Sequence, residues 1–245
     1  MLCFIHIEKA AGTSFHEILK QHIPDYLILK PHPRHGADFS PKQLKLLLFY
    51  FPEIKGVGGH RLRPYLNYES AINKEIEYIT ILRSPIDRYL SHYFHHINNG
   101  ISNMSLNQFI EIPYFNNFMC RKICGEPSAN LAIKLINQKK IKILFLEDIS
   151  GFEKKNSGIS SNNYSVVKES NYAKLKACNM EDLKLYEYFK KRGSDYDYFK
   201  NVIIGNTDKK ISKMNNFKTR IIQEIFQRLF YQLSGRKPEQ LTRGY

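Results

Sequence analysis

Short apolar runs alternate with longer amphipathic stretches along this chain. The apolar runs are rich in isoleucine, leucine, phenylalanine and tyrosine, and several end in turns with glycine, serine or proline. Continuous apolar runs of this kind, separated by helical stretches, are typical of strands buried in a parallel sheet. The pattern predicts five strands, at 3–7, 26–29, 55–57, 78–82 and 141–145.

The stretches between these runs repeat apolar residues at helical spacing, and several begin with serine, threonine or proline, which favour a helix start. We expect helices at 13–22, 41–51, 85–98, 105–110, 128–137, 180–192 and 216–233. Alternating strands and helices predict an α/β fold, with a mainly parallel sheet flanked by helices. We expect one large domain at 1–205 and a C-terminal helical appendage at 206–245, packed on the same domain.

The turn after the first strand combines a lysine with small residues. It contains Lys9, Ala11 and Gly12, and the next helix opens with Thr13 and Ser14. Small residues let backbone N–H groups approach an oxyanion, while the helix start and the lysine supply positive charge. The turn therefore predicts an anion-binding loop, with an ordinary capped strand–turn–helix junction as the alternative.

The position of the lysine bears on which anion is bound. In loops that hold ATP or GTP, a Gly-Lys pair directly precedes the Ser/Thr residue. Here Lys9 stands four residues before Thr13. The spacing disfavours a nucleotide kinase or nucleoside triphosphatase, which we keep as an alternative function.

A second strand end also carries anion-binding residues. Arg83 follows the strand at 78–82, Pro85 suits the first position of a helix, and Ser91 lies eight residues after Arg83. A guanidinium fork and a hydroxyl suit a terminal phosphate. The alternative is an Arg83–Asp87 ion pair that braces the turn.

Together the two segments resemble the sulfotransferases that use 3′-phosphoadenosine 5′-phosphosulfate (PAPS), and most of all the carbohydrate O-sulfotransferases of the heparan 2-O and chondroitin/dermatan type. The resemblance covers about residues 3–190. The residues that match the family's 5′-phosphosulfate loop are Lys9, Ala11, Gly12, Thr13 and Ser14. Those that match its 3′-phosphate site are Leu82, Arg83, Pro85, Arg88, Tyr89 and Ser91.

Two positions depart from the family pattern. Glu8 stands where proline is usual, and Ser84 stands where an acid or amide is common. Glu8 directly precedes Lys9, so one interpretation is that its carboxylate neutralises the lysine. Other carbohydrate sulfotransferases use a glutamate, so the resemblance also makes Glu8 a candidate base.

The resemblance implies a P-loop-like nucleotide-binding fold and transfer of a sulfuryl group from PAPS to an acceptor hydroxyl, with no metal. Lys9 would be catalytic, by neutralising charge on the leaving phosphate, and Arg83 with Ser91 would hold the 3′-phosphate. The family's 2-O enzymes use a histidine base from a Gly-His pair, and Gly59-His60 follows the strand at 55–57. We therefore take His60 as the candidate base. Its rivals are His16, His35 and Glu8.

The chain is strongly basic, with 37 Lys and Arg against 23 Asp and Glu and a formal net charge of +14. A multiply charged donor and an anionic acceptor would account for this excess, and Arg61 and Arg63 near the candidate base would suit an acidic sugar. No basic run is long enough for a nucleic-acid arm, so no nucleic-acid partner is expected. A non-catalytic polyanion-binding protein is the second alternative. The expected acceptor is a carbohydrate hydroxyl.

Targeting signals and cysteine spacing give no further indication of function. The sequence shows no signal peptide and no apolar run of membrane-spanning length, so we expect a cytoplasmic enzyme without stable membrane insertion. The four cysteines lack metal-site spacing and are expected to be reduced thiols. The sequence does not indicate the identity of the acceptor or the oligomeric state.

Overall fold

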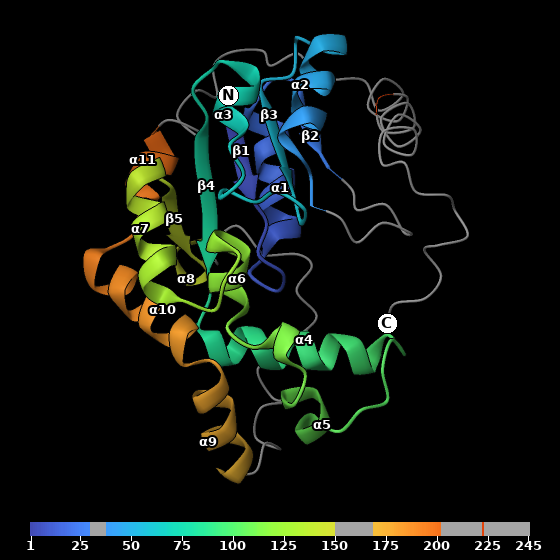
Figure 1. The fold of residues 1–245 in the computed structure, drawn as a ribbon, viewed down its shortest axis with the longest axis vertical. Helices are drawn as coiled ribbons and strands as arrows, with labels where there is room; N and C mark the ends of the chain where they lie inside the picture. Colours follow the sequence, from blue (N-terminus) through green and yellow to red (C-terminus); the bar gives the residue numbers. More distant parts are fainter. Residues whose placement is uncertain (30–37, 150–168, 202–221, 223–245) are drawn as a thin grey trace.

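The computed structural model describes residues 1–29, 38–149, 169–201 and 222 (Figure 1). In this part of the chain, five strands form one parallel sheet in the order β2-β3-β1-β4-β5. Their bounds are Leu2–Ile5 for β1, Tyr26–Ile28 for β2, Gly56–Gly59 for β3, Glu77–Leu82 for β4 and Lys142–Phe145 for β5. The predicted α/β class with a parallel sheet is confirmed.

The third strand ends two residues later than predicted. It extends through Gly58 and Gly59, which pair in register with β1, instead of ending at residue 57. A side chain at position 58 would meet the Tyr26 hydroxyl at 1.9 Å and the His16 ring at 2.8 Å. Gly58 therefore leaves room for the Tyr26 and His16 side chains over the sheet. Because glycine is not part of an apolar run, the apolar pattern did not predict that Gly58 belongs to the strand.

Six helices lie within two residues of their predicted bounds at either end. They are α1 (Gly12–His22), α2 (Pro41–Tyr50), α4 (Pro85–Asn98), α5 (Leu106–Ile110), α7 (Ala129–Lys139) and α10 (Met180–Arg192). None of the helices in the described ranges is long and apolar enough to cross a bilayer.

Several further helices were not predicted. They are α3 (Tyr68–Ile72), η1 (Pro113–Phe115), α6 (Phe118–Cys124), α8 (Leu146–Ile149), α9 (Glu169–Cys178) and α11 (Tyr196–Phe199). Most are too short to show a helical period, and α9 overlaps the end of a stretch rich in Ser, Asn and Lys. The predicted helix at 216–233 and the appendage at 206–245 lie outside the described residues except for Ile222, which is helical and buried.

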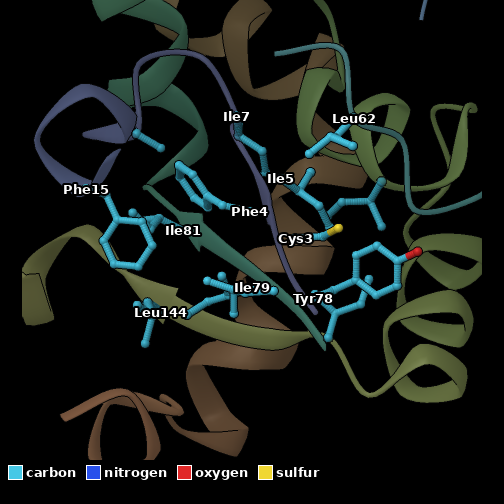
Figure 2. Close-up of a cluster of buried hydrophobic side chains, with 14 of the residues drawn as sticks. Cys3, Phe4, Ile5, Ile7, Phe15, Leu62, Tyr78, Ile79, Ile81 and Leu144 are labelled. Carbon is cyan, nitrogen blue, oxygen red and sulfur yellow. The ribbon is translucent and has the colours of Figure 1, made fainter. Parts of the chain in front are cut away.

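Apolar side chains cover both faces of the sheet (Figure 2). On one face Phe4 and Ile79 lie beside Phe15 of α1, with the Phe4 and Phe15 ring centroids 4.7 Å apart. On the other face lie Cys3 and Tyr78, and the Lys139 amine of α7 sits over the Tyr78 ring. Helices therefore pack on both faces, as the prediction required.

The carboxyl ends of the parallel strands meet at one edge, and α4 runs across that edge in Figure 1. Strand β1 lies between β3 and β4, and the chain leaves β1 towards β2 on one side and leaves β4 towards β5 on the other. Open α/β sheets bind ligands at such a switch point. The loops that follow β1, β3 and β4 carry Lys9, His60 and Arg83, so the fold brings the predicted site residues to one edge.

Helices α6 and α10 cap each other. The Asn117 side-chain oxygen accepts hydrogen bonds from two N–H groups at the start of α10. The buried Asp182 carboxylate accepts hydrogen bonds from the N–H groups of Met119 (2.9 Å) and Cys120 (2.8 Å) at the start of α6. Each helix start thus receives an acceptor that its own sequence does not supply, which joins α6 to α10.

Candidate functional site

The loop after β1 has the geometry of an open helix start. Lys9 and Ala11 adopt left-handed backbone conformations, with φ of 68° and 57°, which non-glycine residues seldom do. Ala11 is the N-cap of α1, and no side chain of the described residues makes a capping hydrogen bond to this helix. The first N–H groups of α1, in Gly12, Thr13 and Ser14, are thus left without a side-chain acceptor and fit an anionic group.

Position 12 has no room for a side chain, because the His6 ring occupies the space next to it. A Cβ atom at this position would lie 1.9 Å from Nε2 of His6. The His6 ring therefore packs directly against the helix start.

Lys9 and Arg83 join the two predicted anion sites. Nη1 of Arg83 donates a hydrogen bond of 3.0 Å to the Lys9 carbonyl oxygen, so the loop after β4 braces the loop after β1. Partial burial, with the nearby Arg83 charge, lowers the pKa of the Lys9 amine. Two half-buried cations at one sheet edge favour an anionic ligand.

Ser91 is less accessible than a phosphate-binding serine was expected to be. It lies on α4, is 1% exposed, and its hydroxyl oxygen has no hydrogen-bond partner among the described residues. Arg88, one turn earlier, is fully buried, and its Nε is likewise unpaired within the described part of the chain. Unpaired buried polar atoms cost about 1–3 kcal/mol each, so both atoms are suited to a ligand or water that satisfies them.

His60 is the first residue after β3, and its side chain is 34% exposed. Its ring stacks on that of His6, with centroids 3.8 Å apart and planes 31° apart. Its Nδ1 lies 3.3 Å from Oε1 of Glu8, within ion-pair distance, although the atoms are not aligned for a hydrogen bond.

Glu8 does not neutralise Lys9 as one interpretation of the sequence had it. Its Oε1 instead lies 2.8 Å from Nζ of Lys122, a residue of α6 that is 3% exposed. Burial opposes ionisation of Glu8, but Lys122 and His60 outweigh burial and hold the pKa of the carboxyl well below its usual range. Burial lowers the pKa of the Lys122 amine to about 8 despite the attraction of Glu8.

His16, a rival base, is held on both ring nitrogens. Its Nε2 lies 3.1 Å from Nδ1 of His6, and its Nδ1 lies 2.9 Å from the Tyr26 hydroxyl. Burial, with the nearby His60, lowers the pKa of His16 to about 3. His35, the other rival histidine, lies outside the described residues.

A pocket of about 200 Å³ lies between α1 and the carboxyl ends of β2 and β3. It is lined by His6, Thr13, His16, Glu17, Ile28, Leu29, Gly59 and His60. Residues 9–14, the candidate anion-binding loop, are called the anion loop below. Thr13 of this loop and His60, the candidate base, thus line one cavity. Within the described ranges, no group of three His, Cys, Asp or Glu side chains is placed to hold a metal ion.

Arg63 is already engaged by the protein. Its Nη2 lies 2.9 Å from the Asp38 carboxylate, and its Nη1 donates a hydrogen bond to the His60 carbonyl oxygen at 2.9 Å. This arginine thus shapes the turn around His60, and an acidic sugar would have to compete with Asp38 for it.

Lys122, His6 and Tyr26 also belong to the candidate site and were not predicted from the sequence. The one available signal was Glu8, because a carboxylate in a buried loop needs a cationic partner. Nothing in the sequence identifies Lys122 as that partner, since 114 positions separate the two residues.

Comparisons with known proteins leave the family open. No protein-family model and no curated protein sequence matches this chain. Among solved structures, the chain is similar to a sulfotransferase from Alicyclobacillus acidocaldarius, with 14% sequence identity and a TM-score of 0.46. The match covers 76% of this chain and 94% of that one. A structural similarity at this identity and TM-score does not assign a function. A function for this chain has to be argued from the residues of the candidate site.

Proposed function

We propose that this protein is a PAPS-dependent sulfotransferase that transfers a sulfuryl group to an acceptor hydroxyl, most suitably on a saccharide. One observation carries the proposal: Thr13 of the anion loop and His60 line the same pocket. Lys9 belongs to the same loop, and Arg83 contacts the loop through its hydrogen bond to the Lys9 carbonyl oxygen.

The donor would lie along the loops after β1 and β4. PAPS supplies an activated sulfuryl group on its 5′-phosphate. The N–H groups of Gly12, Thr13 and Ser14 would hold the phosphosulfate, and Lys9 would stabilise the negative charge that grows on the leaving oxygen. Arg83 would bind the 3′-phosphate. The buried Ser91 hydroxyl, which has no hydrogen-bond partner among the described residues, would donate a second hydrogen bond to it. Such donors are positioned before the reaction begins and need little reorganisation.

His60 is better suited to act as the base than its described rivals. It is partly exposed at the pocket, whereas both His16 nitrogens are hydrogen-bonded. Glu8 stays ionised to low pH, and a carboxylate of low pKa is a weak base.

The lining of the pocket supports a sugar as acceptor. Ile28 and Leu29 give the lining apolar contact, while Thr13 and His60 give it polar groups. A sugar ring has both an apolar face and hydroxyl groups. Glu17 also lines the pocket, and its carboxylate favours a neutral ring over an anionic one.

Ligand-induced stabilisation separates this function from its alternatives. The unfolding temperature would be measured with 3′-phosphoadenosine 5′-phosphate, with ATP and Mg²⁺, and with heparin. A ligand at a hundred times its dissociation constant stabilises the folded state by about 2.7 kcal/mol. We expect a shift with the first ligand. A shift only with ATP and Mg²⁺ would favour a kinase or triphosphatase, and one only with heparin a polyanion-binding protein.

Turnover tests the role of Lys9 directly. Transfer from labelled PAPS would be followed over a panel of saccharides, small alcohols and phenols. Replacing Lys9 with methionine should reduce kcat by about 10²–10³-fold, the usual effect of losing one charge-stabilising group. The exposed Lys45 of α2 provides a matched control, since Lys45→Met should retain full activity. Full activity of Lys9→Met would contradict the mechanism.

A further inference from the structure

We propose that Glu8 is a positioning residue for His60. Its carboxylate accepts the Nδ1 proton of His60, which leaves Nε2 unprotonated to take the acceptor's proton, while Lys122 holds the carboxylate in place. This inference rests on the proposed function for its catalytic consequence, but the geometry that supports it is independent of the reaction.

The first support is the position of the carboxylate. Oε1 of Glu8 lies 2.8 Å from Nζ of Lys122 and 3.3 Å from Nδ1 of His60, so one oxygen faces both groups. Nδ1 of His60 is buried and makes no hydrogen bond to any described residue. Glu8 is therefore the acceptor within reach, and a small rotation of the imidazole would align the pair.

The second support is how Lys122 is fixed. Its amine donates hydrogen bonds both to Glu8 and to the backbone carbonyl oxygen of His60. One buried amine thus ties the carboxylate and the base to the same point of α6. The charge of Lys122 also keeps Glu8 ionised, and only an ionised carboxylate requires a proton on Nδ1.

The third support is the face of the imidazole. His6 stacks against the His60 ring, and burial, with the nearby His60 and His16, lowers the pKa of His6 to about 2. The stacked ring is therefore neutral and restricts the plane of His60 without repelling a charged form. Among the described residues, the titratable and charged groups that act on His60 or on its partners are Glu8, Lys122, His6, His16, Arg61 and Arg63.

The arrangement defines a balanced proton transfer. A lone pair of the acceptor oxygen forms the new O–S bond, and the hydroxyl proton passes to Nε2 of His60. The S–O bond to the 5′-phosphate breaks, and its electron pair stays on the phosphate oxygen. The Nδ1 proton remains on His60 and is shared with Glu8, whose negative charge stabilises the imidazolium that forms.

The tautomer of His60 tests the proposal without any reaction. Long-range ¹H–¹⁵N NMR correlations distinguish a protonated from an unprotonated ring nitrogen, and His60→Gln identifies the resonances. We expect Nδ1 to be protonated and Nε2 unprotonated in neutral His60 of the wild-type protein. The Glu8→Gln variant should lose this preference, and the exposed Glu111→Gln control should keep it. An Nε2-protonated tautomer in the wild type would overturn the proposal.

Kinetics supply the second readout. The Glu8→Gln variant should lose about 10²-fold in kcat, with little change in KM for the acceptor, and its pH–rate profile should change in the limb that reports the base. Glu8→Asp should recover part of the rate. Wild-type kcat in folded Glu8→Gln would overturn the proposal.

Two controls keep the outcomes separate. If Glu8→Gln fails to fold, the double variant Glu8→Gln/Lys122→Met removes both buried charges, and its His60 tautomer is measured instead. If the wild type transfers no sulfuryl group but its His60 tautomer depends on Glu8, the proposed function fails and the positioning role stands.

Discussion

Lys122 and Glu8 form a buried ion pair with 2.8 Å between Nζ and Oε1, although 114 positions separate them. The pair links α6 to the anion loop, and the same amine reaches the backbone of the candidate base. It also accounts for a glutamate at a position where the resembling family has proline. The Glu8 carboxylate pairs with Lys122 of α6, which is distant in the sequence, and not with the adjacent Lys9.

Removing Lys122 should destabilise the protein strongly. Lys122→Met leaves the Glu8 carboxylate beside His60 without its cation, and breaking a buried pair in this way costs about 3–5 kcal/mol. The double variant with Glu8→Gln should recover part of that loss. Urea unfolding measures both. The exposed Lys20–Glu17 pair is the control, because Lys20→Met should change stability by less than about 1 kcal/mol. Equal effects at the two lysines would mean that burial of the pair is unimportant.

Replacing Arg83 should weaken nucleotide binding more than it affects the fold. Arg83→Ala removes the side chain that we propose binds the 3′-phosphate, together with its hydrogen bond to the Lys9 carbonyl oxygen. Hydrogen bonds to charged groups contribute about 1.5–3 kcal/mol, so the Kd for 3′-phosphoadenosine 5′-phosphate should rise about 10–100-fold by calorimetry. Arg192→Ala on the exposed part of α10 should leave the Kd unchanged. An unchanged Kd for Arg83→Ala would remove Arg83 from the site.

Gly12→Ala should destabilise the fold although alanine is the better helix former. Propensity alone would favour alanine by about 1 kcal/mol. The new Cβ, however, would lie 1.9 Å from the His6 ring, which His16 and His60 hold in place, and overpacking costs about 1–3 kcal/mol. In a His6→Ala background the same substitution should be neutral or stabilising. The same cost in both backgrounds would show that the clash is not the cause.

The buried histidines should make stability fall as the pH falls below about 6.5. Burial is the main cause that lowers the pKa of His6 to about 2 and those of His16 and His92 to about 3. Below pH 6.5 the unfolded chain binds protons that the folded state does not, so stability must rise with pH in this range. Each such histidine contributes a slope of up to about 1.4 kcal/mol per pH unit.

His92 allows this slope to be tested apart from the site. His92→Gln keeps an acceptor near Arg88 but removes one titrating group. Urea unfolding at several pH values between 4 and 7 should therefore give a slope lower by about 1.4 kcal/mol per pH unit, whatever the variant's absolute stability. Parallel curves for the two proteins would contradict a neutral buried His92.

Local patterns in the sequence sufficed for the strands and for six of the helices. Apolar runs and helical spacing record which face of each segment is buried, and a parallel sheet places the ends of its strands at one edge. That is why Lys9, Arg83 and His60 were predicted to lie together. Short helices such as α6 left no period in the sequence and were missed.

The tertiary structure alone decided the contacts around these residues. It placed Lys122 against Glu8, joined His6, His16 and Tyr26 by hydrogen bonds, and buried the Ser91 hydroxyl in α4. Such contacts depend on how distant segments pack, and a single sequence carries no local signal for them. The sequence by itself thus determined that Lys9, His60 and Arg83 meet at one edge of the sheet, while packing determined which partner each charged or polar group meets there.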